Sequence, residues 1–355
     1  MMKIKKLLAI SGLFITLGVS AQDYFNHMDL GVNVSSTGIG ADIAMPVGNY
    51  VRLRTGFTYM PKFTFTSNFD VEFLGKISSD KLRRMKDVMY GFSGQPVQDN
   101  VDVLMNPTWT NFKFLVDVFP FPGNKHWNIT AGFYVGPSRI GEAINDENAI
   151  STLSAVNMYN SMYNKACKGE YMYAVEFEDG SMHYGDIPFS QEFIKTGMMG
   201  MPLGYFADGD RAVMVPNKNC LAKADMEISK FRPYVGLGYN TSLSKNGKWK
   251  LAADAGVMFL GGSPHVYVDN VYKVKSIEED ENYYYYNTIW MPKDNEGFPL
   301  LDAEGNVIYE DVTPQRIDLT RDVTKIPGKV GDMVSTVKKF KCWPVLSVTF
   351  SYRLF

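Results

Sequence analysis

Ten charged residues share one phase of an alternating sequence pattern, and they are the side chains best spaced to act on one another. Six are cations and four are anions: Asp29, Asp42, Arg52, Arg54, Lys113, Asp117, Arg232, Lys250, Asp254 and Arg353. If their segments are strands that close into a cylinder, all ten point inward. Charges taken out of water must be paired, so the pattern predicts a closed, salt-bridged interior. A proton or ion path, or a small pore for anions, is the alternative because two positive charges remain in excess.

The residue types that usually carry catalysis are sparse. His27, His126, His183 and His265 each stand alone in the sequence. There is no Gly-x-Ser-x-Gly elbow, phosphate-binding loop or metal-spaced His/Cys cluster. The acidic run 278–281 has no calcium-loop spacing and is typical of a solvated face. We therefore predict no enzymatic activity, no cofactor and no metal.

The element that positions most of these charges is a long alternating run. From Val51 to Phe73 apolar and polar residues alternate for twenty-three positions. This period indicates a strand with one apolar and one wet face. A strand of that length would span roughly 76 Å, which favours a membrane barrel whose apolar side faces lipid.

The same alternation recurs in seven other segments, which makes eight strands in total. They lie at about Met28–Val34, Ile39–Met45, from Val51, Phe112–Val118, Trp127–Val135, Val235–Tyr239, Trp249–Phe259 and Leu346–Phe355. An even number of strands is what a closed antiparallel barrel from one bacterial chain requires. The predicted fold class is all-β, an eight-stranded antiparallel transmembrane β-barrel.

The connections between these segments differ in length. Tight Gly/Asn turns at 46–49, 122–125 and 245–248 alternate with long insertions at about 74–107, 144–230 and 266–341. Short periplasmic turns and long extracellular loops are the usual asymmetry of such barrels, so the insertions are predicted to be extracellular. Within them we expect helices at 80–90 and 147–168 and hairpins at 171–184 and 300–311. We also expect 62–73 to pair with about 96–106, with Pro61 and Pro107 together at the rim.

The first twenty-one residues have the pattern of a cleaved signal peptide. Lys3, Lys5 and Lys6 precede an apolar stretch, and Val19-Ser20-Ala21 is a small-residue cleavage site. Residues 22–355 would then form the barrel domain. The net charge of −2 and the 14% aromatic content imply neither a nucleic-acid partner nor an acidic tail.

Three cysteines remain to be placed. Cys167 and Cys220 lie in the same insertion of an exported chain, where thiols tend to pair, and we predict a disulfide between them. Closing this loop would stabilise the fold by roughly 4 kcal/mol in the chain-entropy model. Cys342 would stay alone, and the alternative is that all three are reduced.

Two stretches resemble a known family. The C-terminal run from Leu346 to Phe355 is similar to the last strand of outer-membrane β-barrels, although Leu354 rather than Phe355 shares the apolar phase. The stretch from Arg232 to Tyr239, with Gly236 and Gly238 in the inward phase, resembles small barrels of the OmpA-like type. The resemblance implies export to the outer membrane of a Gram-negative bacterium, with outer-membrane lipid and the barrel-assembly machinery as partners.

The function expected of such a protein is surface binding, adhesion or envelope integrity, carried by the extracellular loops and an unknown extracellular ligand. A narrow channel or small-solute conduit is the first alternative. An enzyme that modifies outer-membrane lipids is the second.

Overall fold

The computed structural model describes residues 27–70, 72–73, 96–121, 123–168, 174–176, 182–184, 197–280, 283–287, 289–290, 300–305 and 310–354, with a few single positions between 83 and 94 and position 308. The predicted signal peptide, residues 1–21, lies outside these residues and stays a prediction.

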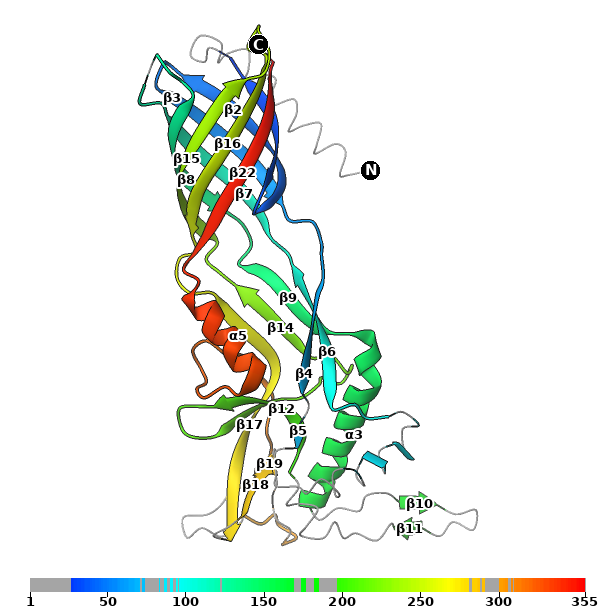
Figure 1. The fold of residues 1–355 in the computed structure, drawn as a ribbon. Coiled ribbons are helices and arrows are strands. Elements are labelled where there is room, and N and C mark those ends of the chain that lie inside the picture. The colour runs from blue at the N-terminus through cyan, green and yellow to red at the C-terminus, as the bar shows by residue number, and fades with distance from the viewer. Residues whose placement is uncertain are drawn as a thin grey trace.

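Eight strands close into an antiparallel barrel (Figure 1). In order round the barrel they are β1 (Asp29–Ser35), β2 (Gly38–Val47), β3 (Val51–Tyr59), β7 (Thr110–Val118), β8 (Trp127–Val135), β15 (Phe231–Ser242), β16 (Trp249–Phe259) and β22 (Cys342–Arg353). Closure comes from β22 pairing with β1, which sets Arg353 opposite Asp29. The predicted all-β, eight-stranded fold is confirmed, and each of the eight predicted segments contributes a strand.

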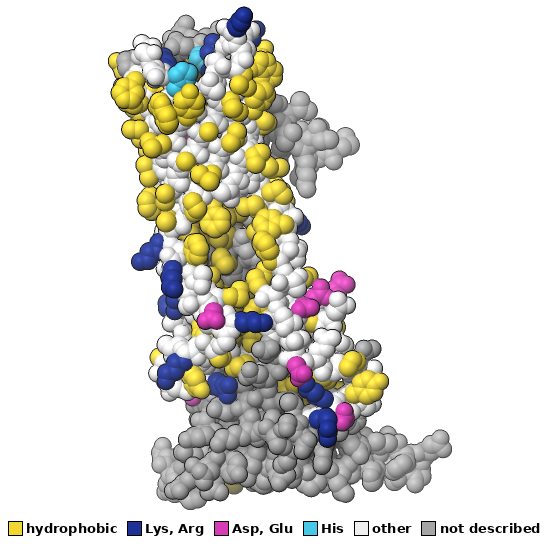
Figure 2. Space-filling view, in the orientation of Figure 1, with side chains coloured by type: hydrophobic (Ala, Val, Ile, Leu, Met, Phe, Trp, Pro, Cys, Tyr) yellow, Lys and Arg dark blue, Asp and Glu magenta, His cyan; other side chains and the backbone are white. Residues whose placement is uncertain are grey.

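Side chains alternate across the barrel wall, apolar outward and polar inward. In β1, for example, Leu30, Val32 and Val34 are exposed while Asp29 and Asn33 are buried. The outward apolar side chains form a broad band on the face that Figure 2 shows. Aromatic rings mark its edges, since Trp249 stacks on Phe350 with centroids 4.9 Å apart near one rim. Phe133 lies 5.2 Å from Phe231 near the other rim.

The two rims of the barrel are built differently. The short-turn rim carries the β2–β3, β7–β8 and β15–β16 turns and the C-terminal end of β22 (Figure 1). Gly48 and Gly247 both adopt φ of +67° in these turns, a conformation that favours glycine. The opposite, long-connection rim carries the tight β1–β2 turn and every long connection.

The long connections build a second sheet beyond that rim (Figure 1). Its path runs β4 (Phe65–Asp70), β6 (Asn100–Pro107), β9 (Arg139–Asn145), β14 (Lys223–Glu227), β17 (His265–Asp280), β13 (Arg211–Met214), β12 (Met199–Tyr205) and β5 (Glu72–Phe73). β18 (Tyr283–Asn287) and β21 (Gln315–Asp318) also pair with β17. Only Val71 separates β4 from β5 in the chain, so the first and last strands of the path are neighbours and the sheet curls round on itself.

Two helices pack against the second sheet and complete an apolar interior. A 3-10 turn (Glu147–Ala149), capped by the Asp146 carboxylate, leads into α3 (Ile150–Cys167), which confirms the predicted helix at 147–168. Val156, Tyr159 and Tyr163 of α3 are buried against β12, β13 and β17. Val334 of α5 (Gly328–Lys339) packs with residues of β12, β17 and β21.

The long alternating run from Val51 to Phe73 is not one strand. β3 ends at Tyr59, and β4 then pairs with β6, Phe65 opposite Met105, as the sequence predicts. Met60 N–H donates to Trp109 O at 2.8 Å, which holds the chain next to Pro61 and Pro107 together. β5 departs from the prediction, because Phe73 pairs with Met199 of β12. Most of the helix predicted at 80–90 lies outside the described residues.

The two predicted hairpins have different outcomes. β10 (Ala174–Glu176) pairs with β11 (Met182–Tyr184), as predicted for 171–184. In the 300–311 region, Ile308 N–H donates to Leu300 O across a turn, but β20 (Glu310–Asp311) pairs with β19 (Ile289–Trp290).

The predicted Cys167–Cys220 disulfide stays a prediction, because the Cys167 side chain lies outside what the structure describes. The Cys220 thiol is free and lies 3.9 Å from the Asn157 side-chain nitrogen. Asn157 and Cys167 are ten residues apart on α3, which is roughly 15 Å along the helix axis. A disulfide needs Cα atoms within about 7 Å, and the contact with Asn157 places Cys220 beside the middle of α3. Cys342 is also free, and exposed.

Among the described residues, no helix has both the length and the apolar character needed to cross a bilayer.

Candidate functional site: the barrel lumen

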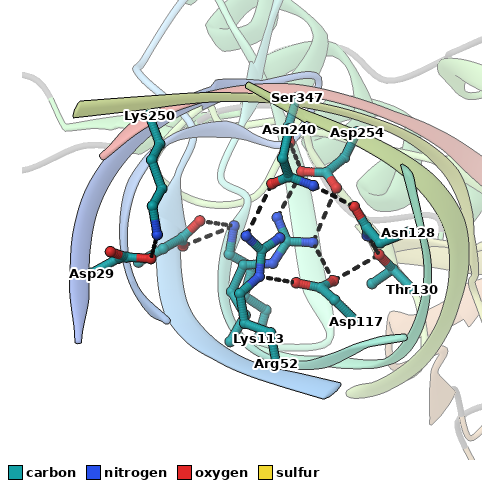
Figure 3. Close-up of polar contacts among 12 residues, drawn as sticks. Asp29, Arg52, Lys113, Asp117, Asn128, Thr130, Asn240, Lys250, Asp254 and Ser347 are labelled. Carbon is teal, nitrogen blue, oxygen red and sulfur yellow. Dashed lines mark hydrogen bonds and ion pairs between the residues drawn. The ribbon is translucent and has the colours of Figure 1, made fainter. Parts of the chain in front are cut away.

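The inward phase of the strands brings the predicted charges into one lumen. Asp29, Asp42, Arg54, Lys113, Asp117, Arg232 and Asp254 are buried, and Arg52, Lys250 and Arg353 are partly buried. Figure 3 looks into this interior and shows most of these side chains converging from the surrounding strands. The lumen is therefore packed with charge rather than hollow, as expected for eight strands.

Arg54 and Asp117 form the centre of the charge cluster. The Arg54 guanidinium donates to Asp254 Oδ2 at 2.6 Å and to Asp117 Oδ1 at 2.9 Å. Asp117 also accepts from Arg52 Nε at 2.8 Å and from the Thr130 hydroxyl at 2.7 Å. Each charge thus meets at least one opposite charge, which offsets the cost of removing it from water.

Two further ion pairs extend the cluster toward β1. Lys113 Nζ lies 2.9 Å from the Asp42 carboxylate, and Lys250 Nζ lies 2.6 Å from Asp29 Oδ2. His27 contacts the second pair, with Nε2 3.0 Å from Lys250 Nζ and 3.5 Å from Asp29 Oδ2. His27 is a member that its isolated position in the sequence did not indicate.

Two of the ten predicted charges stand outside the ion-pair network. Arg232 binds oxygen atoms that carry no formal charge: it donates to Ser229 O at 2.7 Å, to Pro137 O and to the Asn111 side chain. Its guanidinium lies 5.9 Å from the ring centroid of Trp109. Arg353 makes no ion pair within the described part of the chain, and its Nε is buried without a partner there. The expectation that every lumen cation meets a carboxylate is wrong for Arg232, because the carboxylates lie nearer the short-turn rim, and Arg353 does not meet it among the described residues.

A pocket opens from the short-turn rim and ends at the charge cluster. It encloses about 360 Å³, including the part open to solvent, and Arg52, Arg54, Asp29, Asp42 and Lys250 are among its lining residues. The Arg54 Nε and one oxygen of Asp29 are buried without a hydrogen-bond partner on the described protein. This end of the lumen is polar and accessible.

The other half of the lumen is filled by apolar and aromatic side chains. Leu115, Tyr134, Tyr234, Met258 and Val345 are buried in one cluster, which also includes Trp109. Tyr134 and Tyr234 meet edge to face with centroids 5.5 Å apart. We call this set the aromatic layer; it separates the charge cluster from the second sheet.

Paired glycines make room for the aromatic layer. Gly236 of β15 lies opposite Gly256 of β16, and the Tyr234 hydroxyl lies over both. A Cβ atom at Gly236 would fall 2.3 Å from that oxygen, and one at Gly256 would fall 2.5 Å from it. Gly236, which the sequence placed in the inward phase, and Gly256 thus allow one large ring to cross the barrel.

The sequence could have revealed the aromatic layer. Tyr134, Tyr234 and Met258 follow the same alternation as the charged residues, so the sequence pattern predicts that their side chains point into the lumen. Their packing against one another depends on strand register, which brings β8, β15 and β16 side by side.

Outside the lumen, the structure pairs His265 with an acidic residue. His265 Nδ1 lies 2.7 Å from the buried Asp318 carboxylate, which also accepts from the Thr320 hydroxyl at 2.6 Å. Thr320 is on the same side of the imidazole as Asp318, so no nucleophile faces the other ring nitrogen from this group. The cluster stabilises the turn after β21. The described residues hold no group of three or more potential metal ligands.

Comparisons with known proteins do not assign the chain to a family. No protein-family model and no curated protein matches the chain. The similar solved structures include two proteins from Acinetobacter baumannii. CarO2 is 11% identical, with 92% of this chain and 98% of that chain covered and a TM-score of 0.37. CarO is 10% identical, with 91% and 96% covered and a TM-score of 0.36. The likeness is weak, so the fold assignment rests on the closed strand pairing.

Proposed function

We propose that the protein is an outer-membrane β-barrel with a closed lumen that anchors the second sheet at the cell surface as a binding platform. The observation that carries this proposal is that two packed groups of side chains fill most of the lumen. The charge cluster occupies the half near the short-turn rim, and the aromatic layer occupies the other half. A barrel filled in this way serves as an anchor rather than a pore.

The outward face of the barrel supports its insertion into a bilayer. Large apolar side chains such as Val34, Leu237 and Leu346 are more than half exposed, which is unfavourable in water. Aromatic residues lie at both edges of the band, as in membrane barrels. The short turns would then face the periplasm and the second sheet the outside.

The size and order of the second sheet support a role in recognition. A simple anchor or envelope spacer needs no ten-stranded sheet with its own apolar core and two packed helices. We infer that the unknown ligand binds this part, and that the barrel sets its height and orientation.

Conductance in planar bilayers tests the closed lumen. The full-length protein is expected to insert without steady channels, and steady conductance of porin size would overturn the proposal in favour of a channel. A Tyr134→Ala/Tyr234→Ala/Met258→Ala variant removes most of the aromatic layer. It is expected to leak more than wild type if that layer contributes to closure.

Labelling in intact cells tests the orientation. In a background with all cysteines replaced by serine, Asp208→Cys places a thiol on the second sheet and Lys245→Cys places one on a short turn. A membrane-impermeant maleimide should label the first in intact cells and the second after permeabilisation. The reverse order would overturn the assigned orientation.

The polar pocket at the short-turn rim favours a second candidate, a conduit for small solutes. Its arginines could admit an anion, but the aromatic layer blocks passage beyond them. The conductance experiment decides between the two functions.

A further inference from the structure

Four lysines lie close together immediately beyond the apolar band, on the side of the barrel where α5 packs. Lys230 precedes β15, Lys338 and Lys339 end α5, and Lys341 precedes β22. We call these four residues the lysine cluster. Figure 2 shows Lys and Arg side chains just past the edge of the band.

Backbone hydrogen bonds hold the cluster at one level. Leu260 N–H donates to Lys341 O at 3.0 Å, and Ser229 N–H donates to Leu260 O at 3.1 Å. Lys341 and Lys230 are therefore about two strand spacings apart, roughly 10 Å. Lysine side chains are long enough to reach a common group across that distance.

The cluster differs from the cations farther out on the second sheet, which are paired. Arg139 lies 3.4 Å from Asp225, Lys223 lies 3.1 Å from Glu142, and Arg316 lies 3.0 Å from Glu227. The four lysines of the cluster are exposed, and none of them makes an ion pair within the residues that the structure describes. Asp332, the acidic residue of α5, is six positions before Lys338, roughly 9 Å along the helix.

Exposed aromatic rings adjoin the cluster. Phe340 lies between Lys339 and Lys341 and is 46% exposed, and Phe231 follows Lys230. Phe259 is paired with Cys342, next to Lys341. Aromatic rings beside long cationic side chains are characteristic of a membrane–water interface, where the ring enters the bilayer edge and the ammonium group stays among the headgroups.

A structural role explains only part of this arrangement. Lysines in the last turn of a helix favour its C-terminal dipole, which accounts for Lys338 and Lys339. Lys230 and Lys341 belong to strand ends and gain nothing from the dipole. Their convergence with the helix end at the edge of the band calls for an external partner.

We propose that the lysine cluster binds the phosphate groups of membrane lipid where the second sheet meets the bilayer. This inference rests on the proposed function, which places this rim at the outer surface. Phosphate carries the charge that the cluster lacks, and several cations around one anionic headgroup bind it more firmly than a single surface lysine. The contact would also fix the height of the second sheet above the membrane.

Lipid binding by charge-matched variants tests the proposal. Full-length protein in neutral detergent is titrated with bisphosphorylated lipid A and with dephosphorylated lipid A of the same acyl chains, and bound lipid is counted by native mass spectrometry. K230Q/K339Q/K341Q removes three charges from the cluster. The control, K125Q/K245Q/K248Q, removes three exposed lysines from the short-turn rim.

The cluster variant is expected to lose about tenfold or more in affinity for the phosphorylated lipid, since each lysine near an anionic headgroup contributes a few-fold. The control should stay within about twofold of wild type, and high salt should weaken wild-type binding. Equal affinities of the two variants, or wild-type binding that ignores the phosphates, would overturn the inference. If the cluster variant does not fold, the salt dependence of wild-type binding to the phosphorylated lipid tests the inference, and binding that does not weaken at high salt would contradict it. Steady channel conductance would contradict the proposed closed lumen but would not change the lipid-binding result. A negative lipid-binding result would contradict this inference but would not contradict the closed lumen.

Discussion

The barrel and the second sheet are built from one continuous set of strands, but they bury opposite kinds of side chain. The barrel encloses Asp117 and Arg54 and exposes Val34 and Leu237. The second sheet and its helices bury Val156 and Val213 and leave charged side chains such as Arg316 partly exposed. The inversion occurs within a few residues of Phe259, after which Leu260 is buried and β17 turns Val268 and Val274 inward.

The inversion teaches that the surroundings, rather than the β-structure, decide which phase is buried. A wall that faces lipid must place apolar side chains outside and satisfy polar ones within. A wall that faces water does the reverse, because burying apolar area is then favourable. On the proposed function, the change of phase marks the level at which the barrel would leave the bilayer.

The largest expected effect comes from removing the centre of the charge cluster. Asp117→Ala leaves Arg52 with the Asn240 side chain and Arg54 with Asp254 alone. We expect a loss of about 3–5 kcal/mol in the free energy of unfolding, because a buried cation loses its counter-charge. Urea unfolding in lipid vesicles measures it. Asp208→Ala, which removes an exposed partner of Lys273, is the control, and an equal loss in both would contradict the buried network.

Truncation of a buried residue in the second sheet tests its apolar core. Leu203 is almost fully buried, packed near Ile317 and Val334. Leu203→Ala should cost about 2–5 kcal/mol by leaving a cavity. Limited proteolysis should show faster cleavage in the second sheet with the barrel intact. Unchanged protection there would mean that the core does not hold the sheet.

A paired substitution compares the two outer surfaces directly. Leu237→Arg places a charge in the apolar band and should cost about 2–4 kcal/mol if the site is near mid-bilayer. Leu301→Arg, at a similarly exposed residue beyond the rim, should change stability by less than about 0.5 kcal/mol. Folding yield and urea midpoints in vesicles report both. Equal effects would show that the band does not face lipid.

The smallest effect concerns pH in the turn that follows β21. The Asp318 backbone N–H donates to Asp322, and the nearby Arg321 adds attraction, so the pKa of the Asp322 carboxyl is lowered. A lowered pKa stabilises the folded state above the ordinary carboxyl pKa, and this contribution disappears as pH falls below it. Asp322→Asn should therefore increase hydrogen exchange at 318–324 near pH 6, with the difference from wild type narrowing as the pH is lowered below the ordinary carboxyl pKa. A difference that persists at low pH would mean that the charge is not involved.

Local pattern was sufficient for much of the fold. Strict alternation identified all eight barrel strands, because a period of two in a half-lipid, half-polar wall is nearly obligatory. Gly and Asn in the tight turns separated the short-turn rim from the other. The helix at 147–168 followed from its own apolar spacing. The sequence also placed the ten charged residues in the inward phase.

The sequence could not predict which inward side chains contact one another, because these contacts depend on the register between strands that are far apart in the chain. The sequence by itself determined that Arg54 and Asp117 lie on the polar face of their strands, since side chains alternate between the two faces of a strand. Only the tertiary structure decided that they meet, that Arg232 binds carbonyl oxygens instead, and that Tyr134 and Tyr234 pack together in the half of the lumen near the second sheet. It also joined the insertions into one sheet and held Cys220 against the middle of α3. Such contacts arise from how strands stack and helices dock, and no short stretch of sequence records them.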